Sequence, residues 1–195
     1  MTTRIFGLFV LGIALTLFSA CSQESSDSQQ ASSGSQQTSL SGEGSDNAPA
    51  RDYSDEQAII DNATFTDLDG NPVDLSEYEG KLVLIDFWES WCGPCLQVFP
   101  AMADLRTEHP DDFEVLAVTV GLTEGPEEAK AFAEENDYPF TWLYDENGVF
   151  DELGGAGIPF KVFVSPSGEI IEIEMGSRGR EGDYNKAEAK IQEYL

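Results

Sequence analysis

The chain has 195 residues, a formal net charge of −27 at pH 7 and three cysteines. Ten Lys and Arg against 37 Asp and Glu exclude a nucleic-acid-binding protein, because phosphate recognition needs clustered basic side chains. Three cysteines are too few for a fold built on disulfides, whereas a hydrophobic fraction of 41% allows one packed domain with appendages.

The first twenty residues are typical of a secretory signal. Arg4 precedes an apolar run over residues 5–20, which is short for a membrane span and ends in small residues. The last residues of this run, Phe-Ser-Ala followed by Cys21, resemble the bacterial lipobox, whose cysteine is acylated and becomes the mature N-terminus. We expect a lipid on Cys21 to anchor the protein to a bacterial membrane, on the periplasmic side or at the cell surface. The alternative is a plain signal peptide or an uncleaved anchor with an incidental cysteine.

Residues 21–55 are rich in Ser, Gln, Gly and Asp, and Leu40 and Tyr53 are almost their only large apolar side chains. Such a segment cannot bury enough surface to offset the entropy of ordering it. We therefore predict a disordered tether over residues 21–55 and a folded domain over residues 56–195.

The folded part alternates strands and helices. The run at residues 82–85, Leu-Val-Leu-Ile, is typical of a central strand covered on both faces. This alternation predicts an α/β fold with a mixed sheet and helices on both faces. In chain order we predict a β-hairpin within 65–75, a strand over 81–87, a helix from just after Cys92 to about Glu108, a strand over 113–120, a helix opening at 125–128, strands over 140–144, 160–164 and 169–175, and a last helix that Asp183 caps.

The strand expected over 169–175 has alternating character. Ile171, Ile173 and Met175 alternate with Glu172 and Glu174. Because successive side chains of a strand point to opposite faces, this pattern predicts one buried face and one wet face.

The motif Cys92-Gly93-Pro94-Cys95 lies between a predicted buried strand and a predicted helix. At a helix start, unpaired backbone N–H groups and the helix dipole favour a thiolate on Cys92. A thiolate attacks disulfides, and Cys95 lies one turn further along, where it can attack the resulting mixed disulfide. We predict that Cys92 is the attacking thiol and Cys95 the resolving thiol.

Metal and haem sites fit this motif poorly. Zinc usually needs four ligands, but there is no second cysteine pair and His109 is the only histidine. A c-type haem site needs a histidine where Leu96 stands. We therefore expect neither a metal nor a cofactor, and two inert buried thiols remain the alternative.

The flanking residues identify a family. The stretch 86–95, Asp-Phe-Trp-Glu-Ser-Trp-Cys-Gly-Pro-Cys, with Pro100 beyond it, resembles the active-site stretch of thioredoxin. Gly157-Ile158-Pro159 is similar to the loop that carries the family's cis-proline. The opening hairpin and the leader look like the membrane-tethered TlpA and ResA branch. Over about residues 63–195, the resemblance implies a thioredoxin-like fold with an N-terminal hairpin extension, and thiol-disulfide exchange as the reaction.

The resemblance also implies roles for single residues. Asp86, with a pKa raised by burial, would accept the proton of Cys95, whereas a solvated acid at a strand end is the alternative. Pro159, if cis, would sit against the cysteines, exclude metal and water, and leave the Ile158 backbone free to pair with an extended substrate. An ordinary trans proline is the alternative there.

The residues expected to meet substrate are Trp91, Gly93, Pro94 and the Ile158 backbone. Trp91 would form part of a flat apolar rim, although a pure packing role is an equal alternative.

Four positions depart from the family's pattern or stand outside it. Tethered relatives often carry Glu where this chain has Val98, and Thr is common where it has Phe160. Glu89 replaces a small residue; we expect a solvated acid, but one that faced the cysteines would raise the pKa of Cys92. We expect His109 to be a helix C-terminal cap or a surface residue.

Gly-Pro between the cysteines resembles reducing thioredoxins rather than oxidising DsbA-like proteins. We therefore predict an extracytoplasmic reductant of protein disulfides that receives electrons from a transmembrane thiol carrier. Apocytochrome c is a client suggested by analogy alone. The alternatives are a disulfide oxidase or isomerase, a peroxiredoxin-like peroxidase with a cysteine in a different setting near Thr and Arg, and a binding module without redox turnover.

Overall fold

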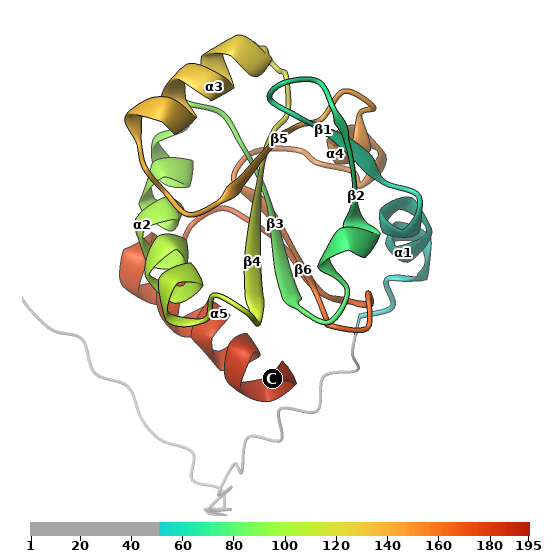
Figure 1. Ribbon diagram of the computed structural model, residues 1–195. Helices are drawn as coiled ribbons and strands as arrows, with labels where there is room; N and C mark the ends of the chain where they lie inside the picture. Colours follow the sequence, from blue (N-terminus) through green and yellow to red (C-terminus); the bar gives the residue numbers. More distant parts are fainter. Residues whose placement is uncertain (1–50) are drawn as a thin grey trace, which may run out of the picture. The chain divides into compact units, whose positions relative to one another are not determined.

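A seven-stranded mixed sheet in the order β2-β1-β5-β4-β3-β6-β7 runs through the folded part of the computed structural model, which describes residues 51–195 (Figure 1). The strands are β1 (Thr64–Asp67), β2 (Pro72–Asp74), β3 (Leu82–Trp88), β4 (Phe113–Thr119), β5 (Thr141–Tyr144), β6 (Phe160–Val164) and β7 (Ile170–Met175). The helices are α1 (Ser54–Asp61), α2 (Gly93–Glu108), α3 (Pro126–Glu135), α4 (Val149–Glu152) and α5 (Gly179–Tyr194), with a 3₁₀ turn, η1 (Leu75–Tyr78).

The sheet is mixed because β3, β4 and β5 are parallel, whereas β6 pairs antiparallel with β3 and the β1–β2 hairpin pairs antiparallel with β5. Helices α2, α3 and α5 pack on one face of the sheet, and α1 and α4 pack on the other (Figure 1). The predicted fold class is confirmed, with the hairpin at the N-terminal side of the domain.

Strand β3 lies at the centre of the sheet and every one of its residues is buried. Leu84 and Trp88 belong to the cluster under α2, whereas Ile85 and Phe87 belong to the cluster on the opposite face. Because side chains alternate along a strand, Asp86 projects toward the face that α2 covers. The fold thus places a carboxyl group on the same side of the sheet as the helix of the cysteine motif.

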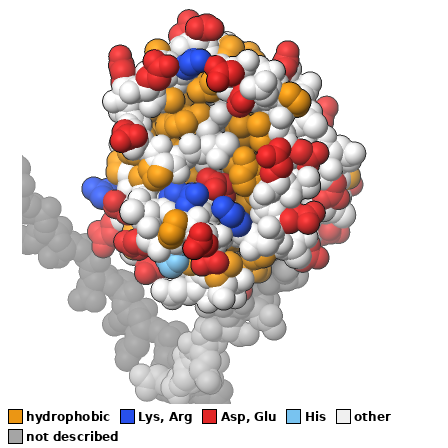
Figure 2. Space-filling view, in the orientation of Figure 1, with side chains coloured by type: hydrophobic (Ala, Val, Ile, Leu, Met, Phe, Trp, Pro, Cys, Tyr) orange, Lys and Arg blue, Asp and Glu red, His pale blue; other side chains and the backbone are white. Residues whose placement is uncertain are grey.

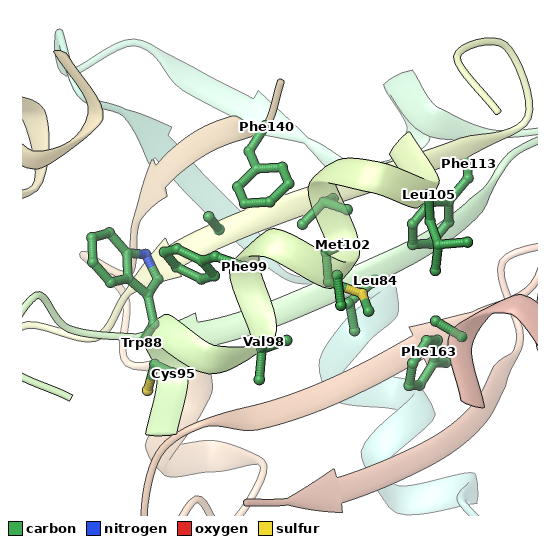
Figure 3. Close-up of a cluster of buried hydrophobic side chains, with 14 of the residues drawn as sticks. Leu84, Trp88, Cys95, Val98, Phe99, Met102, Leu105, Phe113, Phe140 and Phe163 are labelled. Carbon is green, nitrogen blue, oxygen red and sulfur yellow. The ribbon is translucent and has the colours of Figure 1, made fainter. Parts of the chain in front are cut away.

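Aromatic rings fix the position of α2 on this face. Phe99, in α2, lies 5.0 Å from Trp88 and 5.4 Å from Phe140 between ring centroids (Figure 3). Trp88 also lies 5.3 Å from Trp142 in β5. These edge-on contacts join the first turns of α2 to the strand that precedes them, and so hold the cysteine motif against the sheet.

The N-terminal boundary of the folded part differs from the predicted one. Helix α1 begins at Ser54, and the Tyr53 hydroxyl accepts a hydrogen bond from the Ile173 N–H at 3.1 Å. Gln57 also pairs with the β6–β7 turn and with Ile170. The end of the predicted tether is therefore part of the folded domain, because these side chains gain partners from distant segments that composition cannot reveal.

Residues 1–50 lie outside the described part of the chain, and with them the predicted signal peptide, Cys21 and most of the predicted tether. Between residues 51 and 195, no helix is long and apolar enough to span a membrane.

The predicted alternation in β7 is wrong. Residues Ile170 to Glu174 are all half-buried, and Met175 is exposed. A register shift between β6 and β7 places Ile171 on the α2 and α5 face, opposite to Ile173. Glu172 and Glu174 are not open to water either, because α5 covers them. Lys186 and Lys190 of α5 form ion pairs with these two glutamates.

The predicted cap of the last helix is also wrong. Helix α5 begins at Gly179, one turn before Asp183. The Asp183 carboxylate is buried and accepts hydrogen bonds from the Ser177 hydroxyl at 2.6 Å and the Arg178 N–H at 3.2 Å. Asp183 is therefore not the N-cap residue of α5. It lies within the helix, and its carboxylate binds Ser177 and Arg178, which precede the helix.

Candidate active site

The cysteine motif forms the beginning of α2. Cys92 is the N-cap residue, Gly93 and Pro94 open the helix, and Cys95 lies in its first turn. Proline suits this position because the first helical N–H groups have no partner within the helix. The two cysteines form a disulfide with their Cα atoms 5.3 Å apart. The sequence therefore places both sulfur atoms at the positive end of the helix dipole.

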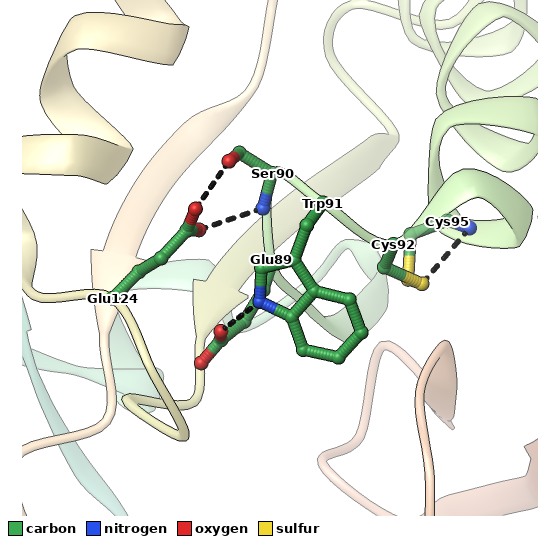
Figure 4. The surroundings of a disulfide bond; sticks show 6 residues. All are labelled: Glu89, Ser90, Trp91, Cys92, Cys95 and Glu124. Carbon is green, nitrogen blue, oxygen red and sulfur yellow. Dashed lines mark hydrogen bonds between the residues drawn. A yellow bond between two sulfur atoms is a disulfide. The ribbon is translucent and has the colours of Figure 1, made fainter.

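The two sulfur atoms differ in their surroundings. Cys95 is fully buried in the cluster under α2, while a small part of Cys92 reaches the surface. The Cys92 Sγ accepts a hydrogen bond from the Cys95 N–H at 3.2 Å (Figure 4). A backbone donor aimed at this sulfur stabilises negative charge on it when the disulfide is reduced. This asymmetry fits an attacking Cys92 and a resolving Cys95.

Asp86 is a fully buried carboxyl group. Neither of its oxygen atoms has a hydrogen-bond partner among the described residues. Burial therefore raises the pKa of Asp86 from 3.8 to about 8, and the nearby Lys161 charge lowers it only in part. Such a carboxyl is largely protonated at neutral pH and is close in proton affinity to an ordinary thiol, whose pKa is about 8.5.

Lys161 joins Asp86 to a buried charge network. The residues Asp86, Lys161 and Glu174 are paired across β3, β6 and β7. The Lys161 ammonium lies 2.8 Å from both the Glu174 and the Asp183 carboxylates. Burial alone would lower the pKa of Lys161, but these two hydrogen bonds outweigh it and raise the pKa. The two carboxylates also raise the pKa of Asp86.

The peptide bond between Ile158 and Pro159 is cis. Ile158 packs against the buried cluster that contains both cysteines. The Pro159 carbonyl accepts a hydrogen bond from the Gly176 N–H at 2.7 Å, whereas no backbone hydrogen bond joins Ile158 to another residue in 51–195.

Trp91 is 56% exposed beside Cys92. Its indole Nε1 donates to the Glu89 carboxylate at 2.6 Å (Figure 4), and also to the Thr123 hydroxyl at 2.8 Å. Glu89 itself is fully buried, so the prediction of a solvated acid is wrong. Its carboxylate lies on the side of the indole away from the disulfide (Figure 4), where it binds donors of the β4–α3 loop.

The remaining singled-out positions have packing or capping roles. Val98 and Phe160 are buried in the two clusters that flank the sheet. His109 is the C-cap residue of α2, as expected, and its N–H donates to the Leu105 carbonyl at 2.9 Å. Within residues 51–195, no three His, Cys, Asp or Glu side chains are grouped as metal ligands would be.

Three residues of the charge network, Lys161, Glu174 and Asp183, were not predicted as part of the site. A lysine inside the run Phe-Lys-Val-Phe-Val was the available signal for Lys161, since a lysine in a buried strand needs a charged partner. Glu174 and Asp183 carried no such signal, because only the fold brings β7 and α5 to β6.

Known proteins resemble this chain over much of its folded part. A family model described as AhpC/TSA family matches residues 56–173. The thiol-disulfide oxidoreductase ResA of Oceanobacillus iheyensis is 37% identical over 113 residues, which are 57% of this chain and 58% of ResA. The chain thus spans about three fifths of the length of that relative.

Solved structures extend the comparison. A Chlorobium tepidum protein named thiol:disulfide interchange protein DsbE has a TM-score of 0.60 and 28% identity, covering 68% of this chain and 92% of its own. The exposed lipoprotein thioredoxin of Streptococcus pneumoniae has a TM-score of 0.56 and 26% identity, covering 67% and 98%.

The raised pKa of Asp86 predicts a pH-dependent stability that Asp86→Asn removes. Below about pH 3.8 the carboxyl is protonated in both the folded and the unfolded chain. As the pH rises toward 8, the unfolded chain ionises while the folded one keeps its proton, so folding is progressively disfavoured. Between pH 4 and 7, the free energy of unfolding of the oxidised wild type should fall by about 4 kcal/mol relative to the variant. Urea unfolding at several pH values measures this difference, and parallel pH profiles would contradict it.

Proposed function

Because this chain belongs to the AhpC/TSA family of thioredoxin-like proteins, we propose that it is a thiol-disulfide oxidoreductase that reduces disulfides of protein clients. The observation that carries this proposal is the Cys92–Cys95 disulfide at the start of α2, on the same face of the sheet as the protonated, buried Asp86. Relatives named thiol-disulfide oxidoreductase support it.

The reaction has two exchange steps. In the reduced protein, the Cys92 thiolate attacks one sulfur of the client disulfide, and the other client sulfur leaves as a thiolate and takes up a proton. The Cys95 thiol then gives its proton to the ionised fraction of Asp86 and attacks the Cys92 sulfur. The second client sulfur is released, and the Cys92–Cys95 disulfide remains. Two electrons have passed from the protein to the client.

Asp86 suits the second step because its proton affinity is close to that of a thiol. Transfer from a thiol with a pKa of about 8.5 to a carboxylate with a pKa of about 8 is nearly neutral in free energy. An ordinary aspartate, with a pKa of 3.8, would make the same transfer strongly unfavourable. The Pro159 loop would complete the site by presenting the Ile158 backbone to the client.

The mixed disulfide provides the direct test. Cys95→Ser should accumulate a covalent protein–client complex that dithiothreitol releases, because Cys92 still attacks but nothing resolves the product. Cys92→Ser is the matched control and should form no such complex. Non-reducing gel electrophoresis with mass spectrometry identifies the trapped protein. A complex of equal yield in both variants would contradict the assigned roles, and turnover with hydrogen peroxide but not with protein disulfides would favour a peroxidase.

The direction of electron flow is tested by the reduction potential. We propose a reductant, supplied by a transmembrane thiol carrier, with apocytochrome c as one candidate client. A redox titration of the purified protein should then give about −270 mV, as in thioredoxin, rather than about −120 mV, as in DsbA. A value close to that of DsbA would instead favour an oxidase.

We propose an extracytoplasmic location with a lipid on Cys21, a cleaved signal over residues 1–20 and a tether that leads to the folded domain. The apolar leader before Cys21 and the likeness to an exposed lipoprotein thioredoxin support this location. In a bacterial host, Cys21→Ala should move the protein from the membrane fraction to the soluble fraction, because the acyl chains are lost. Equal membrane association of Cys21→Ala and wild type would contradict a lipid anchor at this residue.

A further inference from the structure

Two glutamates join the active-site loop to the β4–α3 loop. From the active-site loop, the Glu89 carboxylate accepts hydrogen bonds from the Leu122 N–H and from the Thr123 hydroxyl at 2.9 Å. From the β4–α3 loop, the Glu124 carboxylate accepts from the Ser90 N–H at 2.8 Å and from the Ser90 hydroxyl (Figure 4). Each loop thus supplies one carboxylate that binds the other loop.

Glu89 is the stronger constraint of the two because it is fully buried. A carboxylate out of water is tolerated only when hydrogen bonds replace its hydration, and such charge-assisted bonds are stronger than neutral ones. The donors Leu122 N–H, Thr123 hydroxyl and Trp91 Nε1–H all converge on this carboxylate. Displacing any one of them leaves the buried charge less well satisfied, so Glu89 fixes all three groups together.

Two of these fixed residues carry exposed apolar side chains. With its nitrogen held by Glu89, Trp91 presents the apolar part of its ring at the surface beside Cys92 (Figure 4). Leu122, whose N–H is held by the same carboxylate, is 53% exposed. The carboxylates of Glu89 and Glu124 accept hydrogen bonds from N–H and O–H donors of the two loops. Trp91 and Leu122 are the exposed large apolar side chains of these loops.

The distribution of exposed apolar side chains singles out this region. Acidic side chains are scattered over the visible face of the folded part (Figure 2). Among residues 51–195, five large apolar side chains are exposed, and Tyr194 and Leu195 are simply the last two residues. The other three are Trp91, Leu122 and Met175, whose sulfur lies 3.3 Å from the position that a Cβ on Gly157, in the cis-proline loop, would occupy.

We propose that Glu89 is a positioning residue that holds Trp91 and Leu122 as one docking surface for an extended, apolar client segment next to the client's disulfide. The proposal rests on the proposed function and names its substrate class. An extended occupant fits because the Ile158 backbone, on the cis-proline side, has no backbone hydrogen-bond partner among residues 51–195. An apolar occupant fits because Trp91, Leu122 and Met175 would lose water-exposed surface on binding.

The test compares three disulfides as substrates of the reduced full-length protein in single-turnover kinetics. The first is a disulfide-bridged peptide with Val and Phe flanking its cysteines, the second the same peptide with Ser and Gly at those positions, and the third bis(2-hydroxyethyl) disulfide. The wild type should reach half-maximal rate at a lower concentration of the apolar peptide than of the polar one.

Glu89→Ala and Leu122→Ser should each raise the half-saturating concentration of the apolar peptide about tenfold, with little change in its maximal rate. Glu89→Gln, which keeps one acceptor oxygen, should fall between Glu89→Ala and wild type. Leu195→Ser is the matched control, since Leu195 is equally exposed at 53% but lies at the C-terminus, and it should retain the preference. Leu122→Ser changes only an exposed side chain, so it tests the surface even if Glu89→Ala fails to fold.

Two results would overturn the inference. One is an unchanged preference for the apolar peptide in Leu122→Ser. The other is an equal slowing of all three disulfides in Glu89→Ala, since that would mean that Glu89 acts on the cysteines rather than on docking. Failure of the wild type to reduce any of the three disulfides would instead refute the proposed function, and equal use of both peptides by an active wild type would refute the inference alone.

Discussion

The burial of one carboxyl group in the central strand is the constraint on which this site depends. Asp86 occupies a position of β3 at which every neighbour along the strand is buried, and neither of its oxygens has a described partner. A structural role would give such a group hydrogen-bond donors, because an unsatisfied buried polar atom costs free energy. The domain instead keeps a carboxyl group whose pKa of about 8 lies close to that of a thiol.

The charge network around Lys161 also acts on the proton affinity of Asp86. Burial is the largest cause of the raised pKa of Asp86, and the charge of Lys161, its cross-strand partner in β6, acts to lower that pKa. Glu174 and Asp183 bind the ammonium from β7 and α5, and their negative charges raise the pKa of Asp86, which opposes the effect of Lys161. Asp183 in α5, Lys161 in β6 and Asp86 in β3 are therefore linked, because the pKa of Asp86 depends on both of the other charges.

The sequence determines much of this arrangement by local signals. The run before the cysteines predicted β3, the Cys-Gly-Pro-Cys motif predicted the helix start, and the cis-proline followed from the family resemblance. The predictions that were wrong involve partners that are distant along the chain. Glu89 looked like one more surface acid because its donors belong to the β4–α3 loop, and Asp183 looked like a cap because its lysine lies on β6. Burial of a charge is set by the fold around it, and so composition and periodicity cannot reveal it.

The protonation of Asp86 in the folded protein tests the account most directly. Carbon-13 NMR of the aspartate carboxyl groups, assigned with Asp86→Asn, reports this titration in the oxidised and in the reduced protein. The account predicts that the Asp86 carboxyl titrates at about pH 8 when Cys92 and Cys95 are joined, and that its titration changes when the disulfide is reduced. A carboxyl that titrates near pH 4 in both forms would contradict it, since such a group could not accept a proton from the resolving thiol.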